Sequence, residues 1–224
     1  MIKFLDLEDF TKGLKPVTST GINTRTGEFD TQGLFSELIF GNIGSLDRKT
    51  KFSFINLNAF VVHPSALKLL TQLNRKVEKF ISTEDSFILD KDGSLLEESD
   101  KGVTGITAFM KIFPEIKWRE DSEERTKIAI VLKHAYDNNR LFVNKIPVIP
   151  VEFRPAYQDE ITKEWTVDNL NEYYIKIIRQ SLSMKGSGGK GPLYDLLNYG
   201  LQKAVIDHDE YIRTKVGKKS GIIR

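Results

Sequence analysis

The chain has 224 residues, of which 40% are hydrophobic and 29% charged, and its formal net charge is +2. This length allows one large domain or two small ones, and so small a net charge is no argument for nucleic acid by itself. The absence of cysteine excludes disulfides and thiolate metal sites, and three histidines far apart in sequence argue against zinc. No apolar run approaches the ~18 residues of a membrane span. The N-terminus contains acidic residues and does not have the pattern of a signal peptide, so we expect a cytoplasmic location.

The first 80 residues combine a turn-rich start with apolar segments. Residues 1–33 are rich in Gly, Asn, Thr and Asp, which mark turns. Gly33–Gly41, GLFSELIFG, predicts a short buried segment between two glycines. Phe52–Pro64 predicts a strand that ends in a turn, with His63 as a turn residue. Pro64 suits the first turn of a helix whose apolar face continues through Phe80.

The region from 81 to 145 predicts a hairpin and two helices. Ser86–Leu96 predicts a β-hairpin that turns at Asp92 and Gly93. The run from Asp90 to Gly93 is only faintly like a calcium loop, because it lacks the twelfth-position carboxylate. Thr104–Phe113 predicts a short helix stopped by Pro114.

Asp121 and Ser122 open the helix with the clearest amphipathic pattern in the chain. Apolar residues recur at helical spacing, at Ile128, Val131, Leu132, Ala135 and Tyr136. The acidic residues at its start suit the positive end of the helix dipole, and nothing in the sequence supports a catalytic carboxylate pair. Asn138 and Asn139 end this helix, and Leu141–Val143 leads onward as a strand.

A proline-rich strap precedes a long helix. Pro147, Pro150 and Pro155 predict that the chain from Ile146 to Ala156 is extended and non-helical. Thr166 is the expected N-cap of the next helix, supported by Asp168 in its first turn. The apolar residues of that helix follow at helical spacing, at Leu170, Tyr173, Tyr174, Ile177, Ile178 and Leu182.

The long helix should end near Lys185, where Gly186–Pro192 begins. This segment is not a phosphate-binding loop, because it follows a helix and lacks the G-x-x-x-x-G-K-[ST] order. We interpret it as a flexible tip, after which Pro192 starts a second, antiparallel helix. Arms of roughly 20 residues would give a hairpin about 30 Å long.

The last residues, Tyr211–Arg224, are basic and contain no acid. Five cations lie there, namely Arg213, Lys215, Lys218, Lys219 and Arg224. They are consistent with a solvated tail or with a segment that contacts phosphates.

Several of these segments carry a resemblance to one family. Ile146–Pro155 resembles the extended proline-rich segment of the large β′ subunit of multi-subunit RNA polymerases, and Thr166–Gln180 resembles the start of its clamp helices. Gly33–Gly41 is similar to a block near the beginning of β′, and Phe52–Pro64 to the strand and Val-x-His-Pro turn that follow. Gly217–Arg224 resembles the segment that enters the switch touching template DNA.

The sequence departs from that family in two places. Where cellular β′ subunits carry a four-cysteine zinc ribbon, this chain has only Asn42–Lys51. The chain also contains no D-x-D-G-D pattern, whose aspartates hold the catalytic magnesium of β′. The resemblance therefore implies the front part of a split subunit, as in polymerases of large bacteriophages. It implies no cofactor in this chain and magnesium in the fragment that carries those aspartates.

The resemblance implies an α+β clamp module with small β elements, several amphipathic helices and a projecting helical hairpin. Its parts would be a clamp head at 1–80, an α+β segment at 81–145, strap and lid at 146–165, clamp helices at 166–209, and rudder and switch at 210–224. A self-contained globule with the stretch from Leu170 to Val205 folded into its centre, instead of projecting, would refute this interpretation. The implied partners are a C-terminal β′ fragment, β-like subunits, a sigma-like promoter-specificity factor, template DNA and the RNA–DNA hybrid, in the cytoplasm of an infected bacterium.

The resemblance also places functional residues. The docking set for the specificity factor is Tyr174, Arg179, Lys185 and Lys190, and the nucleic-acid set is the five cations of the tail. For Arg154 two placements stay open: it faces nucleic acid, or it packs against Glu152 or Asp159. The chain would be inactive alone and act as part of a nucleotidyltransferase complex. An alternative is a stand-alone interaction protein that imitates the clamp helices and sequesters a sigma-like factor.

Overall fold

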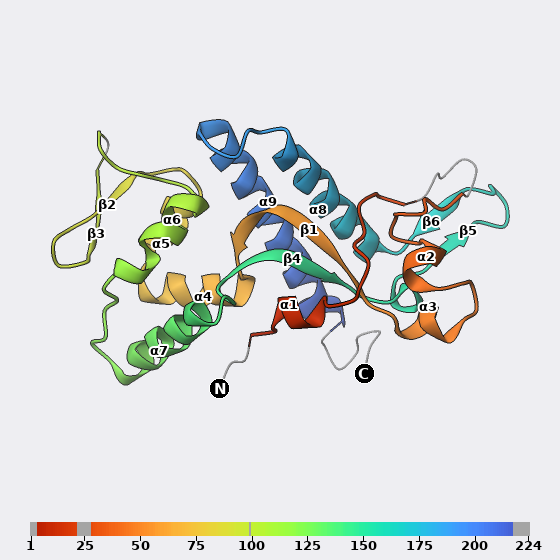
Figure 1. Cartoon of the computed structure of the whole chain (residues 1–224), viewed down its shortest axis with the longest axis horizontal. Helices are drawn as coiled ribbons and strands as arrows, with labels where there is room; N and C mark the ends of the chain where they lie inside the picture. The colour runs from red at the N-terminus through yellow and green to blue at the C-terminus, as the bar shows by residue number, and fades with distance from the viewer. Residues whose placement is uncertain (1–3, 22–27, 99, 217–224) are drawn as a thin grey trace. The chain divides into compact units, whose positions relative to one another are not determined.

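The computed structural model describes residues 4–21, 28–98 and 100–216 (Figure 1). Their contacts divide the chain into two compact units, each assembled from three separate stretches. Unit 1 comprises the described residues of Met1–Asp6, Ala59–Asn144 and Ser183–Gln202. Unit 2 comprises those of Leu7–Asn58, Lys145–Leu182 and Lys203–Arg224. The division therefore does not follow the sequential segments expected from the sequence.

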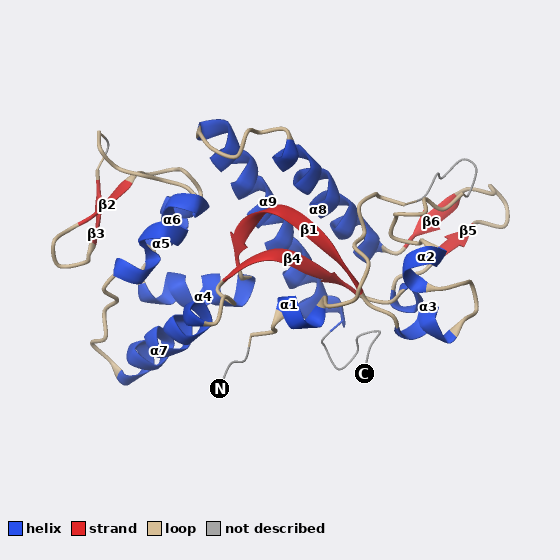
Figure 2. Ribbon diagram, viewed as in Figure 1, coloured by secondary structure: helices blue, strands red, loops and turns tan. Residues whose placement is uncertain are grey.

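The expected α+β class is confirmed: the described chain combines helices with small two-stranded sheets (Figure 2). The α-helices are α1 Leu7–Phe10, α2 Glu37–Phe40, α3 Leu46–Thr50, α4 Pro64–Leu73, α5 Lys76–Ile81, α6 Ile106–Ile112, α7 Glu123–Asp137, α8 Asn169–Lys185 and α9 Pro192–Tyr211. Shorter turns are the 3-10 helices η1 Phe113–Glu115 and η2 Val151–Phe153 and the π-helix η3 Ile212–Val216. The strands are β1 Ser53–Val62, β2 Phe87–Leu89, β3 Leu95–Glu97, β4 Phe142–Val148, β5 Ala156–Gln158 and β6 Trp165–Val167. They pair as β1 with β4, β2 with β3, and β5 with β6.

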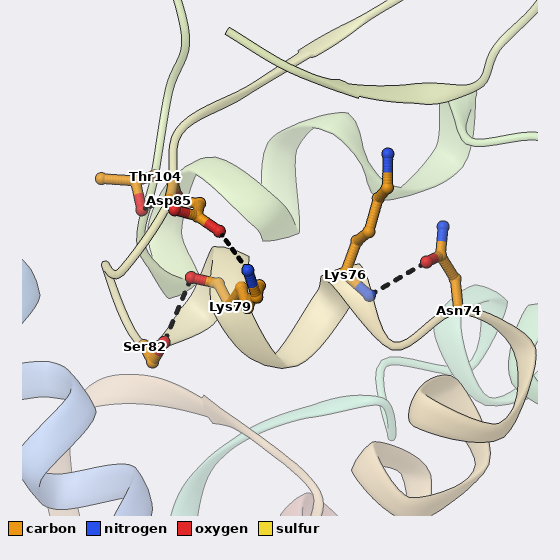
Figure 3. A network of polar contacts seen from close by, with 6 residues as sticks. All are labelled: Asn74, Lys76, Lys79, Ser82, Asp85 and Thr104. Atoms are coloured by element: carbon orange, nitrogen blue, oxygen red, sulfur yellow. Dashed lines mark hydrogen bonds and ion pairs between the residues drawn. The ribbon is translucent and has the colours of Figure 1, made fainter. Parts of the chain in front are cut away.

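In unit 1, the helix expected to run through Phe80 is two helices. Asn74 separates α4 from α5 because its backbone is extended, with φ −152°, and its side-chain oxygen accepts from the Lys76 N–H at 3.0 Å (Figure 3). Phe80, on α5, lies fully buried against Phe87 and Phe109, with ring centroids 5.2 and 5.6 Å apart. After the break, α5 turns its apolar face toward these two rings.

The hairpin and the amphipathic helix predicted in this unit are both confirmed. Strands β2 and β3 pair antiparallel, with Phe87 opposite Glu97, and Gly93 takes φ +85° in the turn. Helix α7 begins after Ser122, whose hydroxyl accepts from the Arg125 N–H. It packs against α4 and ends at Asp137, where Asn138 is the C-cap.

In unit 2, most of the glycine-bounded segment is buried as expected, although Glu37 and Leu38 are exposed. Leu34, Phe35 and Phe40 have no exposed surface, and Ile39 is 4% exposed. The Val17 N–H donates to the Phe54 carbonyl at 2.8 Å, which joins the N-terminal stretch to β1. The apolar segment therefore serves as a core element of unit 2.

The strap is extended as expected through β4 but contains one 3-10 turn, η2, after Pro150. The chain then forms an antiparallel hairpin of β5 and β6, in which Tyr157 pairs with Thr166. Thr166 is therefore a strand residue and not the N-cap of α8. The Asp168 carboxylate takes that place by accepting from the Leu170 N–H at 2.8 Å.

Helices α8 and α9 form the antiparallel hairpin that the sequence predicts. In unit 2, Lys176 pairs with Asp207 at 2.6 Å, and the rings of Tyr173 and Tyr211 lie 4.7 Å apart. The glycine-rich segment between the helices begins at Gly186, as expected.

The expectation that this hairpin projects is corrected in one respect, because its inner face is seated on β1. In unit 2, the Ser181 hydroxyl donates to the Asn56 carbonyl and accepts from the Asn58 amide, at 2.6 and 2.7 Å. In unit 1, the Gln202 amide bonds both the N–H and the carbonyl of Val62. Buried apolar residues continue this face, at Leu170, Ile177, Ile178, Met184, Leu201, Ala204 and Val205. Only the opposite face is available to a partner.

Candidate functional site

The proposed docking residues fall into two groups by exposure. Lys185, at the end of α8, and Lys190, in the tip, are both exposed. Arg179 is exposed on α8. Tyr174 is fully buried, and this placement corrects its assignment as a docking residue.

Tyr174 faces inward because it follows Leu170 by one helical turn on the buried side of α8. Its hydroxyl accepts from the Ile149 N–H at 3.3 Å, and its ring lies 4.7 Å from that of His208. Burial raises the pKa of Tyr174 to about 12, only partly offset by the positive charge of Arg154. The residue therefore joins the strap to the hairpin and cannot contact another protein.

The tip that carries Lys190 is built from glycines in the left-handed region. Gly188, Gly189 and Gly191 have φ of +74°, +77° and +96°, and no atom lies within 4 Å of a Cβ built on any of them. Just beyond them, Leu193 and Leu196 are 62% and 59% exposed. The tip thus presents a lysine beside uncovered apolar side chains.

A small cavity of about 260 Å³ lies between this tip and α6, inside unit 1. Lys111 and Lys190 line it, together with Tyr194 and Asp195. Partial burial raises the pKa of Asp195, whose carboxylate lies against Gly105 at the start of α6. An alanine at Gly105 would clash with that carboxylate, so the approach of the tip to α6 depends on this glycine.

Arg154, in the strap, is the largest fully buried side chain among the described residues. Its Nε–H donates to the Ile149 carbonyl and its Nη1 to the Asn171 side-chain oxygen, both at 2.9 Å. The Asn171 amide returns a bond to the Arg154 carbonyl at 3.0 Å. Both open alternatives for Arg154 are therefore wrong, because it neither reaches solvent nor pairs with Glu152 or Asp159.

Aromatic rings complete the surroundings of this guanidinium. Its carbon lies 4.8 Å from the ring centroid of Phe40, 5.5 Å from that of Phe35 and 5.7 Å from that of Tyr174. These distances are those of cation–π contacts. Burial lowers the pKa of Arg154 to about 10, so the group stays charged at neutral pH. We call Arg154, its three rings and Asn171 the arginine cage.

The β5–β6 hairpin occupies the position expected for the lid. Its loop is shaped by Asp159, whose carboxylate accepts from the N–H groups of Ile161 and Thr162 at 2.8 and 2.7 Å. These backbone bonds lower the pKa of Asp159. Ile161, at the loop, is 92% exposed, and Tyr157 is 55% exposed. The loop therefore presents apolar groups to its surroundings.

The predicted nucleic-acid set can be placed only at its first member. Arg213 is exposed and forms an ion pair with Asp209 at 2.7 Å. Lys215 lies in η3, and its side chain is outside the described part of the chain, as are Lys218, Lys219 and Arg224. These assignments remain predictions.

Within the described residues, no group of three or more His, Asp or Glu side chains could hold a metal ion. The part of the chain with described positions also has no helix with the length and apolarity needed to cross a membrane. Neither a protein-family model nor a curated protein matches this chain.

The sequence interpretation named Arg154 and Tyr174 but not their buried cluster, and it missed Asn171 and His208. The sequence contains one usable signal: Arg154 lies between the apolar residue Phe153 and Pro155, which restricts the backbone. No local signal marks Asn171 or His208, because their buried neighbours are distant in sequence: Arg154 for Asn171 and Tyr174 for His208.

Proposed function

We propose that the chain is the non-catalytic N-terminal part of a split β′-like subunit and forms the clamp of a phage-type DNA-directed RNA polymerase. One observation carries the proposal: three sequence landmarks that follow one another as in β′ have the structural character that the resemblance implies. Gly33–Gly41 is a buried segment, Phe52–Pro64 is a strand entering a helix, and Ile146–Gln180 is a strap entering α8.

In this proposal the chain has a mechanical role. It holds DNA and docks a promoter-specificity factor, while the partner fragment that carries the magnesium-binding aspartates performs nucleotidyl transfer. The arginine cage supports such a role, because it fixes the strap to the first turn of α8 through Ile149 and Asn171. A fixed joint sets the direction in which the hairpin presents its outer face.

Because the inner face of the α8–α9 hairpin is buried, the proposed docking surface is limited to its exposed residues. Lys185 and Lys190 remain exposed in unit 1, and Leu193 and Leu196 beside them supply apolar surface. Cations at the rim of an apolar patch suit an acidic, partly apolar helix of the specificity factor, since rim charges steer association and the apolar centre supplies affinity.

Co-purification tests the proposal most directly. A tagged copy of the chain, recovered from its native host and analysed by mass spectrometry, should bring a subunit with a D-x-D-G-D motif and a β-like subunit. Recovery of the chain as a lone monomer would refute the proposal. Recovery with a sigma-like factor alone would favour the stand-alone protein that sequesters such a factor.

The docking surface has its own test in the same complex. Lys185→Glu with Lys190→Glu should weaken retention of the specificity factor about tenfold, because two rim charges are reversed. The polymerase subunits should stay bound. The matched control is Lys12→Glu with Lys49→Glu, which reverses two exposed lysines of unit 2. Equal loss of the factor in both variants would show that the tip is not where it docks.

A further inference from the structure

A cleft of about 1110 Å³ lies within unit 1, and its lining includes none of the residues that the sequence interpretation assigned to docking or nucleic-acid binding. Its walls are the end of α4, the start of α5, strand β3, the segment 116–119 and the start of α7. It is more than four times larger than the cavity at the hairpin tip.

The cleft is positively charged although the whole chain is nearly neutral. Its lining includes five cations and two carboxylates: Arg75, Lys76, Lys117, Arg119 and Arg125 against Glu78 and Glu124. Arg125 is held by Asp121, at 2.7 Å. Neither Arg75 nor Arg119 forms an ion pair with any residue whose position is described. A concave wall with a surplus of one sign of charge concentrates ligands of the opposite sign.

Hydrogen bonds to the backbone hold two walls of the cleft in place. The Lys117 N–H donates to the Gly93 carbonyl at 2.9 Å, which joins the segment 116–119 to the turn of β2–β3. Across the cleft, the Asn74 side-chain oxygen accepts from the Lys76 N–H at the start of α5, and the Lys76 side chain extends away from the helix (Figure 3). The Lys76 ammonium donates to the Leu95 carbonyl at 3.4 Å. The cleft is therefore a preformed feature of the unit.

An aromatic side chain stands between two of the cations. Trp118 lies between Lys117 and Arg119 in sequence, is only partly buried, and packs one side on Phe113 at 5.8 Å between ring centroids. Leu96, on β3, is 41% exposed in the same cleft. A supported indole among cations is the arrangement with which proteins bind single-stranded nucleic acids, because bases stack while phosphates are neutralised.

We propose that this cleft binds a single-stranded polynucleotide, with phosphates on Arg75, Lys117 and Arg119 and a base against Trp118. An acidic polypeptide would satisfy the cations but would leave the indole face without a planar partner. A duplex buries its bases and would offer only its phosphates. The inference does not depend on the polymerase proposal, and it would stand if co-purification found no polymerase subunit.

Tryptophan fluorescence can test the site in the full chain. The sequence has two tryptophans, so Trp165→Phe leaves Trp118 as the only emitter. Binding of a deoxythymidine oligonucleotide of about ten residues should quench this emission. Trp118→Leu should weaken binding of the same oligonucleotide, labelled and followed by anisotropy, about tenfold, the size of one base–aromatic stack.

A salt titration tests the charges. Arg75→Ala with Arg119→Ala should reduce the magnitude of the slope of log K against log salt by about 1.4, since each single-strand phosphate contact contributes about 0.7. Lys12→Ala with Lys49→Ala removes the same charge from exposed positions in unit 2 and should leave the slope unchanged.

Three results would overturn the inference. Equal slopes for the two double variants would show that the cleft is not the site. Equal affinity for a duplex of the same length would exclude a single-strand site. Polyglutamate that quenches Trp118 as strongly as the oligonucleotide, and displaces it, would make the ligand an acidic polypeptide.

Discussion

The two units place arginines in opposite surroundings. In unit 2, Arg154 is fully buried, with two hydrogen bonds and three aromatic rings around its guanidinium. In unit 1, Arg75 and Arg119 are exposed on the walls of a cleft. In the sequence, the three arginines are residues of the same chemical type. In the structure, Arg154 can serve only the fold, whereas Arg75 and Arg119 are accessible to a ligand.

The difference shows what a buried cation requires. Removing a charge from water is costly unless hydrogen bonds and nearby polarisable groups compensate. The arginine cage offers a carbonyl, an amide oxygen and ring faces, but its Nη2 lacks a hydrogen-bond partner within the described structure. Compensation is therefore incomplete, which is consistent with the lowering of the Arg154 pKa by burial.

The largest effect should come from emptying the cage. Arg154→Ala should lower the free energy of unfolding by about 4 kcal/mol, because it leaves a cavity and removes the partners of Ile149 and Asn171. Arg75→Ala, the exposed counterpart, should change it by no more than about 0.5 kcal/mol. Urea unfolding followed by Trp165 emission in a Trp118→Phe background reports on Arg154→Ala in unit 2, and Trp118 emission in a Trp165→Phe background reports on Arg75→Ala in unit 1. Similar losses of unfolding free energy in the two variants would show that the buried arginine is no more important for stability than the exposed one.

A second buried group makes unit 2 sensitive to acid. Burial lowers the pKa of His208 to about 4, with the charge of Asp209 opposing the shift. The unfolded chain binds a proton near the ordinary pKa of 6.5, so between pH 6.5 and 4 it binds more protons than the folded chain. The neutral, buried His208 therefore makes its full contribution to the free energy of unfolding above pH 6.5. As the pH drops from 6.5 to 4, this contribution falls by about 3 kcal/mol.

His208→Phe keeps an aromatic ring beside Tyr174 and removes the titration. Between pH 7 and 4, the parent should lose about 3 kcal/mol more unfolding free energy than this variant. His134→Gln replaces an exposed histidine of α7 and should retain the parental pH dependence, because His208 is still present. A parental curve that runs parallel to that of His208→Phe would disprove the buried-histidine explanation.

Features with a local cause could be predicted from the sequence. Ser122 caps α7, and the left-handed Gly93 turns the β2–β3 hairpin, each through contacts within a few residues. The glycine tip after Lys185 and the buried segment before Gly41 follow from composition alone. Such signals do not depend on how distant parts of the chain meet.

Features decided by distant contacts could not be predicted. Tyr173 and Tyr174 are neighbours with equal helical propensity, but only Tyr174 faces the strap, and its burial removed it from the docking set. Arg154 depends on Asn171, 17 residues away. The cleft joins residues from α4 through α7 whose charges, read in order, are mixed with acids. Its surplus of cations appears only once the chain has folded.

The smallest expected effects concern how the cleft wall is held. An alanine at Gly93 would place its Cβ 2.9 Å from the Cβ of Lys117 and 3.0 Å from the Glu115 carbonyl oxygen, at φ +85°. Gly188 has a similar φ, +74°, but open space around it. Both substitutions incur the left-handed penalty of about 1 kcal/mol, and only Gly93→Ala adds a clash that pushes Lys117 away.

Gly93→Ala should therefore destabilise unit 1 by about 2 kcal/mol and Gly188→Ala by about 1 kcal/mol, measured by urea unfolding with Trp118 emission. The comparison separates backbone strain from displacement of the wall. Because the Lys117 N–H is bonded to the Gly93 carbonyl, Gly93→Ala should also weaken oligonucleotide binding severalfold, while Gly188→Ala should not. Unchanged binding in Gly93→Ala would mean that the cations of unit 1 act as independent flexible charges, without the fixed placement that distinguishes the arginine cage.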